Sequence, residues 1–469
     1  MKRSMSAVFL TLCMAAPALA QDFPPPPPIA EPKPFRLPAT ETYTLPNGMQ
    51  VTLIPYGLAP KTVVSLHVRA GEVTEGDLTW LSELSAAMLK EGTVGRSAGQ
   101  LSTAAADMGG SLNVSAGQQL TIIGTDVLSE HVTDAITLIS DVAIRSDFPA
   151  EALPRVKANL GRQLSVALSQ PGTLADIALQ RTVYGPNHPY GRVVPTQAQL
   201  NGYTLDQVRG FHRSQFGARR AHLYIAGRFD AAAVKAAVAQ RFSSWTPGPE
   251  PLTIVAPHQP GPKVILVDRP GAPQTTLRLA FDAALAGTEA DIPQRVTNSL
   301  LGGAFSSRIT TNIRETKGYT YSPSSSIGFT PGEALWSFDA DVTTNVTGAA
   351  LSEVFKEVRR MQTEAVPEEE ARGIRTYMAG TFAIGNSTSP AVVSTLAQRD
   401  LLGLPVDWTE RYVPAVLAVT PAQMMASAKA SYPLNKMTLI VVGDLKTVVP
   451  QLKSVPELKG IAFQTVTVP

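Results

Sequence analysis

Residues 50–66 read QVTLIPYGLAPKTVVSL, and residues 263–279 read KVILVDRPGAPQTTLRL. The two segments align without a gap, and both contain an apolar run, a connection with proline and a second run in which apolar and polar residues alternate. Alternation with a period of two is typical of a strand that is buried on one face. Each segment therefore predicts two strands joined by a short connection, at corresponding places in two halves of the chain.

A second repeat lies near the end of each half. Residues 204–227 read TLDQVRGFHRSQFGARRAHLYIAG, and residues 420–443 read TPAQMMASAKASYPLNKMTLIVVG. Both predict a capped helix, a turn and a buried strand that ends at glycine. Between the repeats apolar residues at helical spacing predominate, for example in residues 351–362, LSEVFKEVRRMQ. We therefore expect an α+β fold of two homologous domains, each a mainly antiparallel sheet covered by helices.

The N-terminal sequence MKRSMSAVFLTLCMAAPALA has the pattern of a secretory signal peptide over residues 1–20. Lys2 and Arg3 form a positive segment, an apolar run follows, and Ala-Leu-Ala forms a cleavage site. Cleavage after Ala20 would remove Cys13, the only cysteine, and would leave a mature chain without disulfides. We expect a periplasmic protein, with full secretion as the alternative.

Two proline-rich stretches divide the rest of the chain. Residues 21–41 begin QDFPPPPPIAEPKP and predict a stiff tether, and residues 247–262 predict a linker. The expected domains are therefore residues 42–246 and residues 263–469.

The charge of the chain argues against a nucleic-acid partner, and its hydropathy argues against a membrane-spanning segment. The formal net charge is +2, and no block of basic residues is interleaved with aromatic residues, which argues against a nucleic-acid partner. After the signal peptide no apolar run is long enough to cross a bilayer, so no membrane span is expected.

Several motifs, in this order and spacing, resemble those of one peptidase family. They are LPNGMQVTLIP (residues 45–55), HPYGR (188–192), GGAFSSR (302–308), IRETKGYTY (313–321) and TLIVVGD (438–444). The chain is similar to the pitrilysin/insulinase family of zinc peptidases, in the style of the mitochondrial processing peptidase. The resemblance covers nearly all of the mature chain and implies two peptidase-like domains that form half of a clam-shell.

The zinc motif of this family is missing. The family places H-x-x-E-H on its first helix, where two histidines bind zinc and the glutamate activates a water. Counted back from Gly92 and Thr93, the corresponding residues are Glu83-Leu84-Ser85-Ala86-Ala87. The helix expected to supply a third ligand, roughly residues 152–175, contains no aspartate or glutamate, and no two histidines are three or four residues apart. We expect no metal site and no catalytic residue on this chain alone.

The resemblance implies a different role for Arg314 and Tyr321. In the family an arginine and a tyrosine seven positions later contact the bound peptide and its reacting carbonyl. Arginine keeps its charge at any working pH, and a tyrosine hydroxyl can donate to a developing oxyanion. The plainer interpretation is a surface ion pair and a half-buried strand aromatic, but the spacing within residues 302–321 favours the substrate-binding pair. The serine-rich residues 322–329 predict a strand edge for an extended substrate.

Members of the family can work as unlike pairs. We therefore expect the non-catalytic, substrate-binding subunit of a periplasmic heteromeric zinc metallopeptidase, with Arg314 and Tyr321 completing an active site. The zinc would belong to a similar-sized partner with H-x-x-E-H, and proteolysis of extended peptides would need that partner. The alternative is a catalytically inactive peptide-binding or scaffold protein of the cell envelope, as a homodimer. A serine hydrolase built on Ser85 is disfavoured, because no G-x-S-x-G elbow is present.

Overall fold

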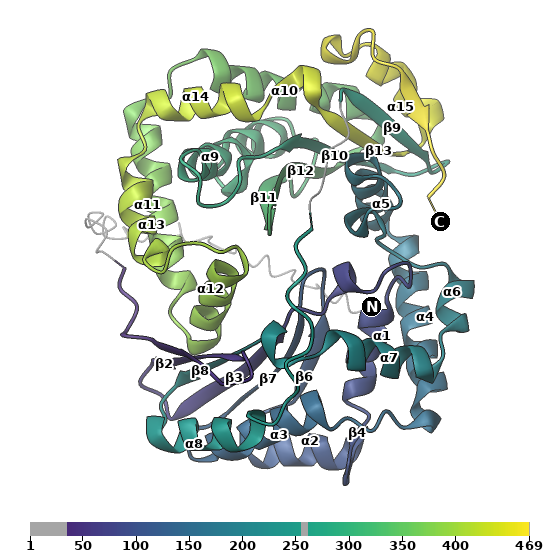
Figure 1. Ribbon diagram of the computed structural model, residues 1–469. Coiled ribbons are helices and arrows are strands. Elements are labelled where there is room, and N and C mark those ends of the chain that lie inside the picture. Colours follow the sequence, from purple (N-terminus) through teal and green to yellow (C-terminus); the bar gives the residue numbers. More distant parts are fainter. Residues whose placement is uncertain (1–34, 255–260, 469) are drawn as a thin grey trace, which may run out of the picture. The chain divides into compact units, whose positions relative to one another are not determined.

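The computed structural model describes residues 35–254 and 261–468. The expected signal peptide, most of the expected tether and the middle of the expected linker lie outside these residues. Two six-stranded mixed sheets covered by helices make up the described chain (Figure 1). The predicted α+β class with two sheet-containing domains is confirmed. Within the described residues, no helix has the length and apolar character needed to cross a membrane.

The first sheet, here called the N-terminal sheet, contains the strands predicted from residues 50–66. From edge to edge the strands are β1 (Glu41–Thr44), β2 (Gln50–Pro55), β8 (Ala221–Gly227), β3 (Lys61–Val68), β7 (Thr121–Leu128) and β6 (Asn113–Ala116). Only β2 and β8 pair in parallel, and all other neighbours in this sheet are antiparallel.

The second sheet, the C-terminal sheet, repeats this order except at one edge, where the last strand of the chain lies parallel to its neighbour. Its strands are β14 (Phe463–Thr465), β9 (Lys263–Asp268), β13 (Thr438–Gly443), β10 (Gln274–Asp282), β12 (Glu333–Thr343) and β11 (Ser324–Thr330). The strands β9 and β10 come from the second copy of the repeat and occupy the places of β2 and β3. A short two-stranded ribbon, β4 (Gly92–Thr93) with β5 (Arg96–Ser97), follows the first helix.

The helices also correspond between the halves. The first half contains α1 (Leu81–Leu89), α2 (Ala98–Asp107), α3 (Val132–Ile144), α4 (Leu153–Ser169), α5 (Pro171–Tyr184), α6 (Gln197–Gly202), α7 (Leu205–Gln215) and α8 (Ala231–Phe242). The second half contains α9 (Asp291–Asn298), α10 (Thr347–Thr363), α11 (Glu368–Gly385), α12 (Ser389–Leu401), α13 (Trp408–Ala418), α14 (Pro421–Ser431) and α15 (Leu445–Lys453). The helices α7 and α14 begin with the same capping box, Thr204 with Gln207 and Thr420 with Gln423, as the repeat predicts.

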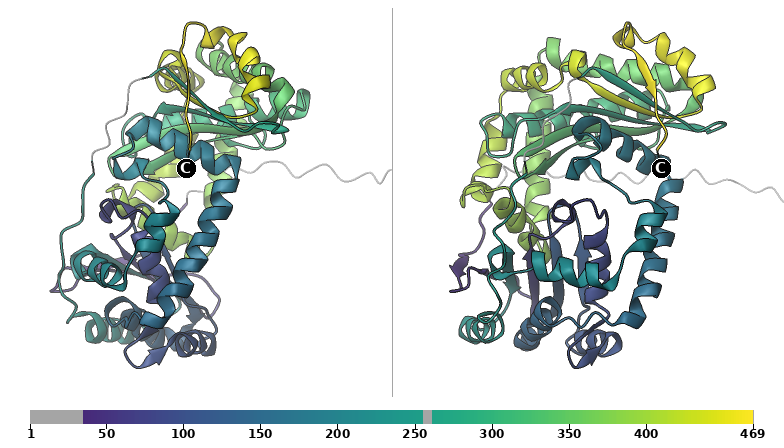
Figure 2. Two further views of the ribbon diagram at one scale, coloured as in Figure 1. Left: turned by 90° about the vertical axis from the view of Figure 1, so that its right-hand side faces the viewer. Right: turned by 45° about the vertical axis from the view of Figure 1, so that its right-hand side comes forward.

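One helix from each half covers the sheet of the other half. Helix α5 packs on β10 and β13, and helix α12 packs on β3 and β8 (Figure 2). All six residues of β13 are buried, so this strand needs an apolar cover on both of its faces. Because the helices of its own half cover one face, the other face is left for α5. The expected boundaries at residues 42–246 and 263–469 stay a prediction.

Helix α12 meets the N-terminal sheet through polar as well as apolar contacts. The buried Tyr224 donates its hydroxyl hydrogen to Asp400 Oδ2 at 2.9 Å, and His222 Nδ1 lies 2.9 Å from the same hydroxyl. The other oxygen of Asp400 accepts from Arg399. Burial lowers the pKa of His222 to about 4 and raises that of Tyr224. The interface therefore holds a neutral imidazole that lies beside the side chains of Tyr224 and Asp400.

Replacing Tyr224 by phenylalanine should lower the free energy of unfolding by about 1–2 kcal/mol, because the ring is kept and a buried hydrogen bond to a carboxylate is lost. Urea unfolding followed by circular dichroism measures this change. The exposed Tyr377 provides the matched control, and Tyr377→Phe should have almost no effect. Equal stability of wild type and Tyr224→Phe would mean that this bond contributes nothing to the docking of α12.

Candidate functional site

Helix α1 lies where the resemblance places the zinc motif. It begins after Trp80, which adopts a left-handed conformation with φ of 67°. The carboxylate of Glu75 accepts hydrogen bonds from the backbone N–H groups of Trp80 and Ser82, at 2.8 and 2.9 Å, and from the Ser82 hydroxyl at 2.7 Å. A buried carboxylate thus satisfies the first turn of the helix and complements its dipole. These contacts fix the start of the helix without any metal.

The residues around α1 do not fit a zinc ion. The motif positions hold Glu83, Ala86 and Ala87, and α4, which packs against α1, has no acidic residue. A protein zinc site needs at least three side-chain ligands. Within residues 35–254 and 261–468, no group of three or more histidine, cysteine, aspartate or glutamate side chains is arranged to hold a metal ion. The carboxyl groups near α1 affect one another's titration instead of binding a metal ion.

Three carboxyl groups near the start of α1 have raised pKa values, mainly because they are buried. Burial, with a smaller contribution from the nearby Glu75, raises the pKa of Glu83 to about 7. Burial likewise raises the pKa of Glu72 to about 7, with added repulsion from Glu75 and Glu83. The pKa of Glu75 is raised by burial although its three hydrogen bonds and Arg192 oppose the shift. Glu72 and Glu83 are therefore the two carboxyls of this cluster whose charge changes near neutral pH.

Glu83→Gln should stabilise the fold at high pH and leave it unchanged at low pH. A carboxyl whose pKa is raised in the folded chain loses stability as the pH rises from its ordinary pKa towards about 7. Glutamine carries no such penalty. After allowance for partial solvent exposure and for coupling within the cluster, we expect a gain of about 1 kcal/mol near about pH 8. Urea unfolding at several pH values measures it, with the exposed Glu289→Gln as control. A gain that grew at low pH would contradict the assignment.

Arg314 and Tyr321 lie together, beside a third residue. Arg314 belongs to a π-helical segment, Thr310–Thr316, and its guanidinium carbon lies 5.0 Å from the centre of the Tyr321 ring and 4.6 Å from that of Phe305. The two rings hold the cation by cation–π contacts. Tyr321 is 78% exposed and Phe305 70% exposed. Two large aromatic side chains therefore face solvent around one arginine.

The plainer interpretation of Arg314 also has a contact in its favour. Its Nε lies 3.2 Å from Glu315 Oε1, and the Glu315 side chain is 58% exposed. An exposed pair of this kind contributes little free energy. The stacking on two exposed rings is the more specific feature, because buried packing does not account for it. Phe305 received no role from residue type alone, although it lies inside GGAFSSR.

The serine-rich stretch forms β11, an edge strand of the C-terminal sheet, as predicted. It pairs with β12, and just before it Thr320 forms an isolated antiparallel bridge with Val342. Arg314 and Tyr321 therefore lie where this edge begins. Among the described residues, the outer side of β11 pairs with no other strand. Apart from the buried Ser325, whose carbonyl oxygen accepts from Asn298 Nδ2 at 3.4 Å, an edge of this kind can accept an extended peptide as an additional strand.

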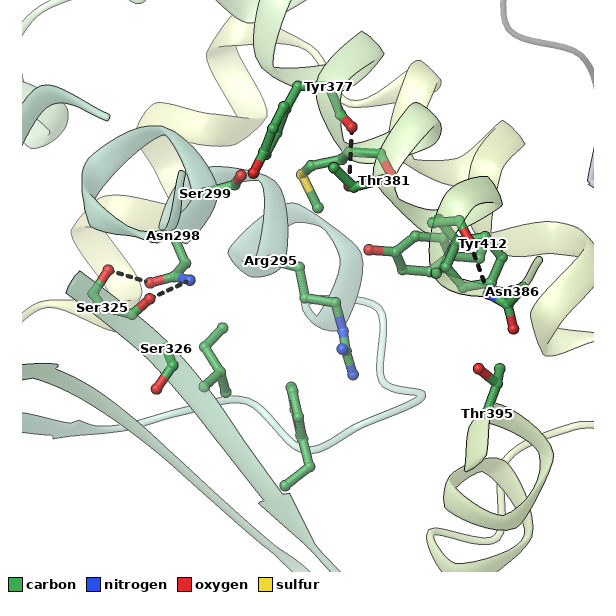
Figure 3. A pocket seen from close by; sticks show the side chains of 16 residues that line it. Arg295, Asn298, Ser299, Ser325, Ser326, Tyr377, Thr381, Asn386, Thr395 and Tyr412 are labelled. Atoms are coloured by element: carbon green, nitrogen blue, oxygen red, sulfur yellow. Dashed lines mark hydrogen bonds between the residues drawn. The ribbon is translucent and has the colours of Figure 1, made fainter. Parts of the chain in front are cut away.

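Two cavities border β11. One, of about 500 Å³, is lined by residues of α9, β11, α11, α12 and α13 (Figure 3). The other, of about 380 Å³, is lined by residues of α5, β10, β11 and β12. Neither cavity could be predicted from the sequence, because each one is lined by residues of helices and strands that are far apart in the chain.

Two sequence models of one peptidase family match successive parts of the chain. The model described as insulinase (peptidase family M16) matches residues 55–192, and the model described as peptidase M16 inactive domain matches residues 202–378. The first match includes α1, and the second includes Arg314 and Tyr321. Together they span the larger part of the chain.

Similar curated proteins are named zinc proteases. An uncharacterized zinc protease of Bacillus subtilis is 22% identical over 77% of this chain and 88% of its own length. One of Mycobacterium tuberculosis is 27% identical over 76% of this chain and 83% of its own length.

Solved structures share the fold. The peptidase M16 inactive domain from Pseudomonas fluorescens has a TM-score of 0.78 at 21% identity and covers 86% of this chain and 98% of its own. A protease from Helicobacter pylori has a TM-score of 0.79 at 16% identity, with 87% and 100% covered. The repeat, the paired sheets and the matched family models agree, and the chain belongs to the insulinase family of peptidases, family M16.

Proposed function

We propose that this protein is the non-catalytic, substrate-binding subunit of a periplasmic heteromeric zinc metallopeptidase. Its Arg314 and Tyr321 would complete an active site whose zinc is held by a similar-sized partner with H-x-x-E-H. One observation carries the proposal: the metal ligands are missing from α1, whereas the arginine and tyrosine of the second half remain in contact, 5.0 Å apart. Loss of one set of residues with retention of the other is expected of one member of an unlike pair.

The geometry around Arg314 suits a contact with a peptide. Phe305 and Tyr321 both contact the guanidinium of Arg314, whose planar fork of donors can bind a peptide carbonyl or carboxylate. The exposed Tyr321 can present its hydroxyl to an incoming oxygen. A peptide bound along β11 would run past both groups, with main-chain hydrogen bonds supplying affinity.

This chain would bind and orient the peptide, and the partner would supply the metal. Zinc on the partner would polarise the scissile carbonyl and activate a water. Arg314 and Tyr321 would place donors where negative charge develops. No hydrolytic step is assigned to the residues of α1, because they do not fit a metal.

A pull-down of the tagged mature protein from its native periplasm, with mass spectrometry of the bound chains, tests the proposal. We expect a zinc-binding relative with H-x-x-E-H in near-equal amount. Recovery of the protein with itself alone, or with unrelated envelope proteins, would overturn the proposal and favour a peptide-binding scaffold. The exposed Phe305 and Tyr321 would then serve peptide capture without cleavage.

A further inference from the structure

The cavity of about 500 Å³ beside β11 contains one charged residue, Arg295. The other lining residues are neutral, and many carry hydroxyl or amide groups. Those with such groups are Asn298, Ser299, Ser325, Ser326, Tyr377, Thr381, Asn386, Thr395 and Tyr412. Figure 3 shows Arg295 extending from α9 into the space between β11 and the helices opposite. A single cation among hydroxyl groups is an arrangement suited to an anion.

Contacts on one side of Arg295 fix its guanidinium. Its Nε donates to Asp291 Oδ1 at 2.5 Å, and the second oxygen of that buried carboxylate accepts from the Gly287 backbone N–H at 2.8 Å. The guanidinium carbon lies 4.0 Å from the centre of the Phe329 ring and 5.6 Å from that of Trp408. The arginine is therefore oriented in advance, which reduces the entropy lost on binding.

The outer nitrogens of Arg295 remain available. Within the described part of the chain, neither Nη1 nor Nη2 has a hydrogen-bond partner, and the side chain is 21% exposed. These two nitrogens form the fork that binds a carboxylate in a bidentate manner. Asn386 lines the same cavity, and its buried Oδ1 likewise has no partner among the described residues. The partly exposed nitrogens of Arg295 are the groups that a bound peptide can reach.

The cavity on the opposite face of β11 has the reverse charge. Its charged residues are Asp176, Arg278, Glu333 and Asp339, so acidic groups outnumber basic ones. Arg278 is already paired with Asp176 at 2.8 Å. A carboxylate is therefore favoured on the Arg295 face and disfavoured on the other.

Strand geometry connects the two faces to a bound peptide. Ser325, Ile327 and Phe329 line the Arg295 cavity, Gly328 and Thr330 line the opposite one, and Ser326 borders both. Side chains of an added strand alternate between the same two faces. A residue of the peptide that points towards Ile327 and Phe329 would reach Arg295.

We propose that Arg295 binds the carboxylate of an aspartate or glutamate side chain in an extended peptide added to β11. The proposal rests on the proposed function and adds a selectivity for the bound peptide. The cavity selects an acidic residue at one position, and the opposite face disfavours acidic neighbours in the alternate positions.

Fluorescence anisotropy with the full mature chain tests this site. The probes are three labelled serine–threonine peptides, each about ten residues long, the length of a long strand. The first has one central glutamate and an amidated C-terminus, the second has glutamine in its place, and the third has no acidic side chain but a free C-terminal carboxylate. We expect the glutamate peptide to bind at least about tenfold more tightly than the glutamine peptide.

Variants of the chain assign the difference to one residue. In Arg295→Gln the preference for glutamate should disappear, and in Arg295→Lys it should return in part, because lysine keeps the charge without the fork. Arg411→Gln, on the exposed side of α13, should keep the full preference. The glutamate-to-glutamine exchange is made on the peptide, so it stays informative if a variant folds poorly.

Each contrary outcome has a distinct meaning. Equal binding of the glutamate and glutamine peptides by the wild type would overturn this proposal and leave the peptide-binding role intact. Preference for the free C-terminus alone would overturn the side-chain assignment. A wild-type chain that bound none of the three peptides would overturn both proposals.

Discussion

Arg314→Ala should lower kcat/KM of the proposed two-subunit peptidase by about two to three orders of magnitude. Loss of one donor aimed at a developing oxyanion costs this much in acyl-transfer enzymes, and Arg314 would also hold the peptide. The removed guanidinium leaves Phe305 and Tyr321 without the cation between them. Hydrolysis of a quenched fluorogenic peptide by this chain mixed with the proposed H-x-x-E-H partner measures the effect.

Three further variants separate chemistry from packing. Tyr321→Phe keeps the ring beside Arg314 and removes only the hydroxyl, so a loss of about tenfold is expected if that hydroxyl contacts the substrate. Arg314→Lys should recover little, because an ammonium does not reproduce the stacked planar fork. Arg411→Ala changes an exposed arginine on another helix and should leave kcat/KM unchanged. Full activity of Arg314→Ala in a complex that still assembles would remove the main support for the proposed role.

Local pattern predicts the strands of this protein well and the packing of its helices less well. The repeat at residues 50–66 and 263–279 predicts β2, β3, β9 and β10, because alternation is read along one strand without knowledge of its neighbours. The packing of α5 and α12, each on the sheet of the other half, could not be predicted in this way. The apolar face of a helix indicates that it is buried, and it does not indicate which of two similar sheets buries it.

The residues of the candidate site also differ in how far the sequence predicts them. Arg314 and Tyr321 are close in sequence, so their spacing predicts a common location, and the structure places them 5.0 Å apart. Their role in binding substrate stays a prediction. Arg295 gave no signal, because its neighbours Phe329 and Trp408 come from β11 and α13 and meet only in the folded chain. A motif of short sequence range can be recognised, whereas a cavity assembled from distant segments cannot.

Trp336→Ala should lower the free energy of unfolding by about 3–5 kcal/mol, a large share of the stability of an ordinary domain. Trp336, on β12, is 1% exposed and packs against the rings of Phe281 and Tyr432. Its Nε1–H donates to Asn298 Oδ1 at 2.6 Å, and the same oxygen accepts from the Ser325 hydroxyl of β11. Urea unfolding measures the loss.

Trp336→Phe distinguishes the two contributions of this residue. The smaller ring keeps most of the packing but cannot donate to Asn298, so a loss of about 1–2 kcal/mol is expected. Because Asn298 also binds Ser325, faster amide exchange should appear in β11 before it appears in β10. Uniform acceleration across the C-terminal sheet would show that Trp336 supports the core alone. Selective loosening of β11 would show that one buried hydrogen bond, from Trp336 to Asn298, sets how firmly the edge strand proposed to bind the peptide is held.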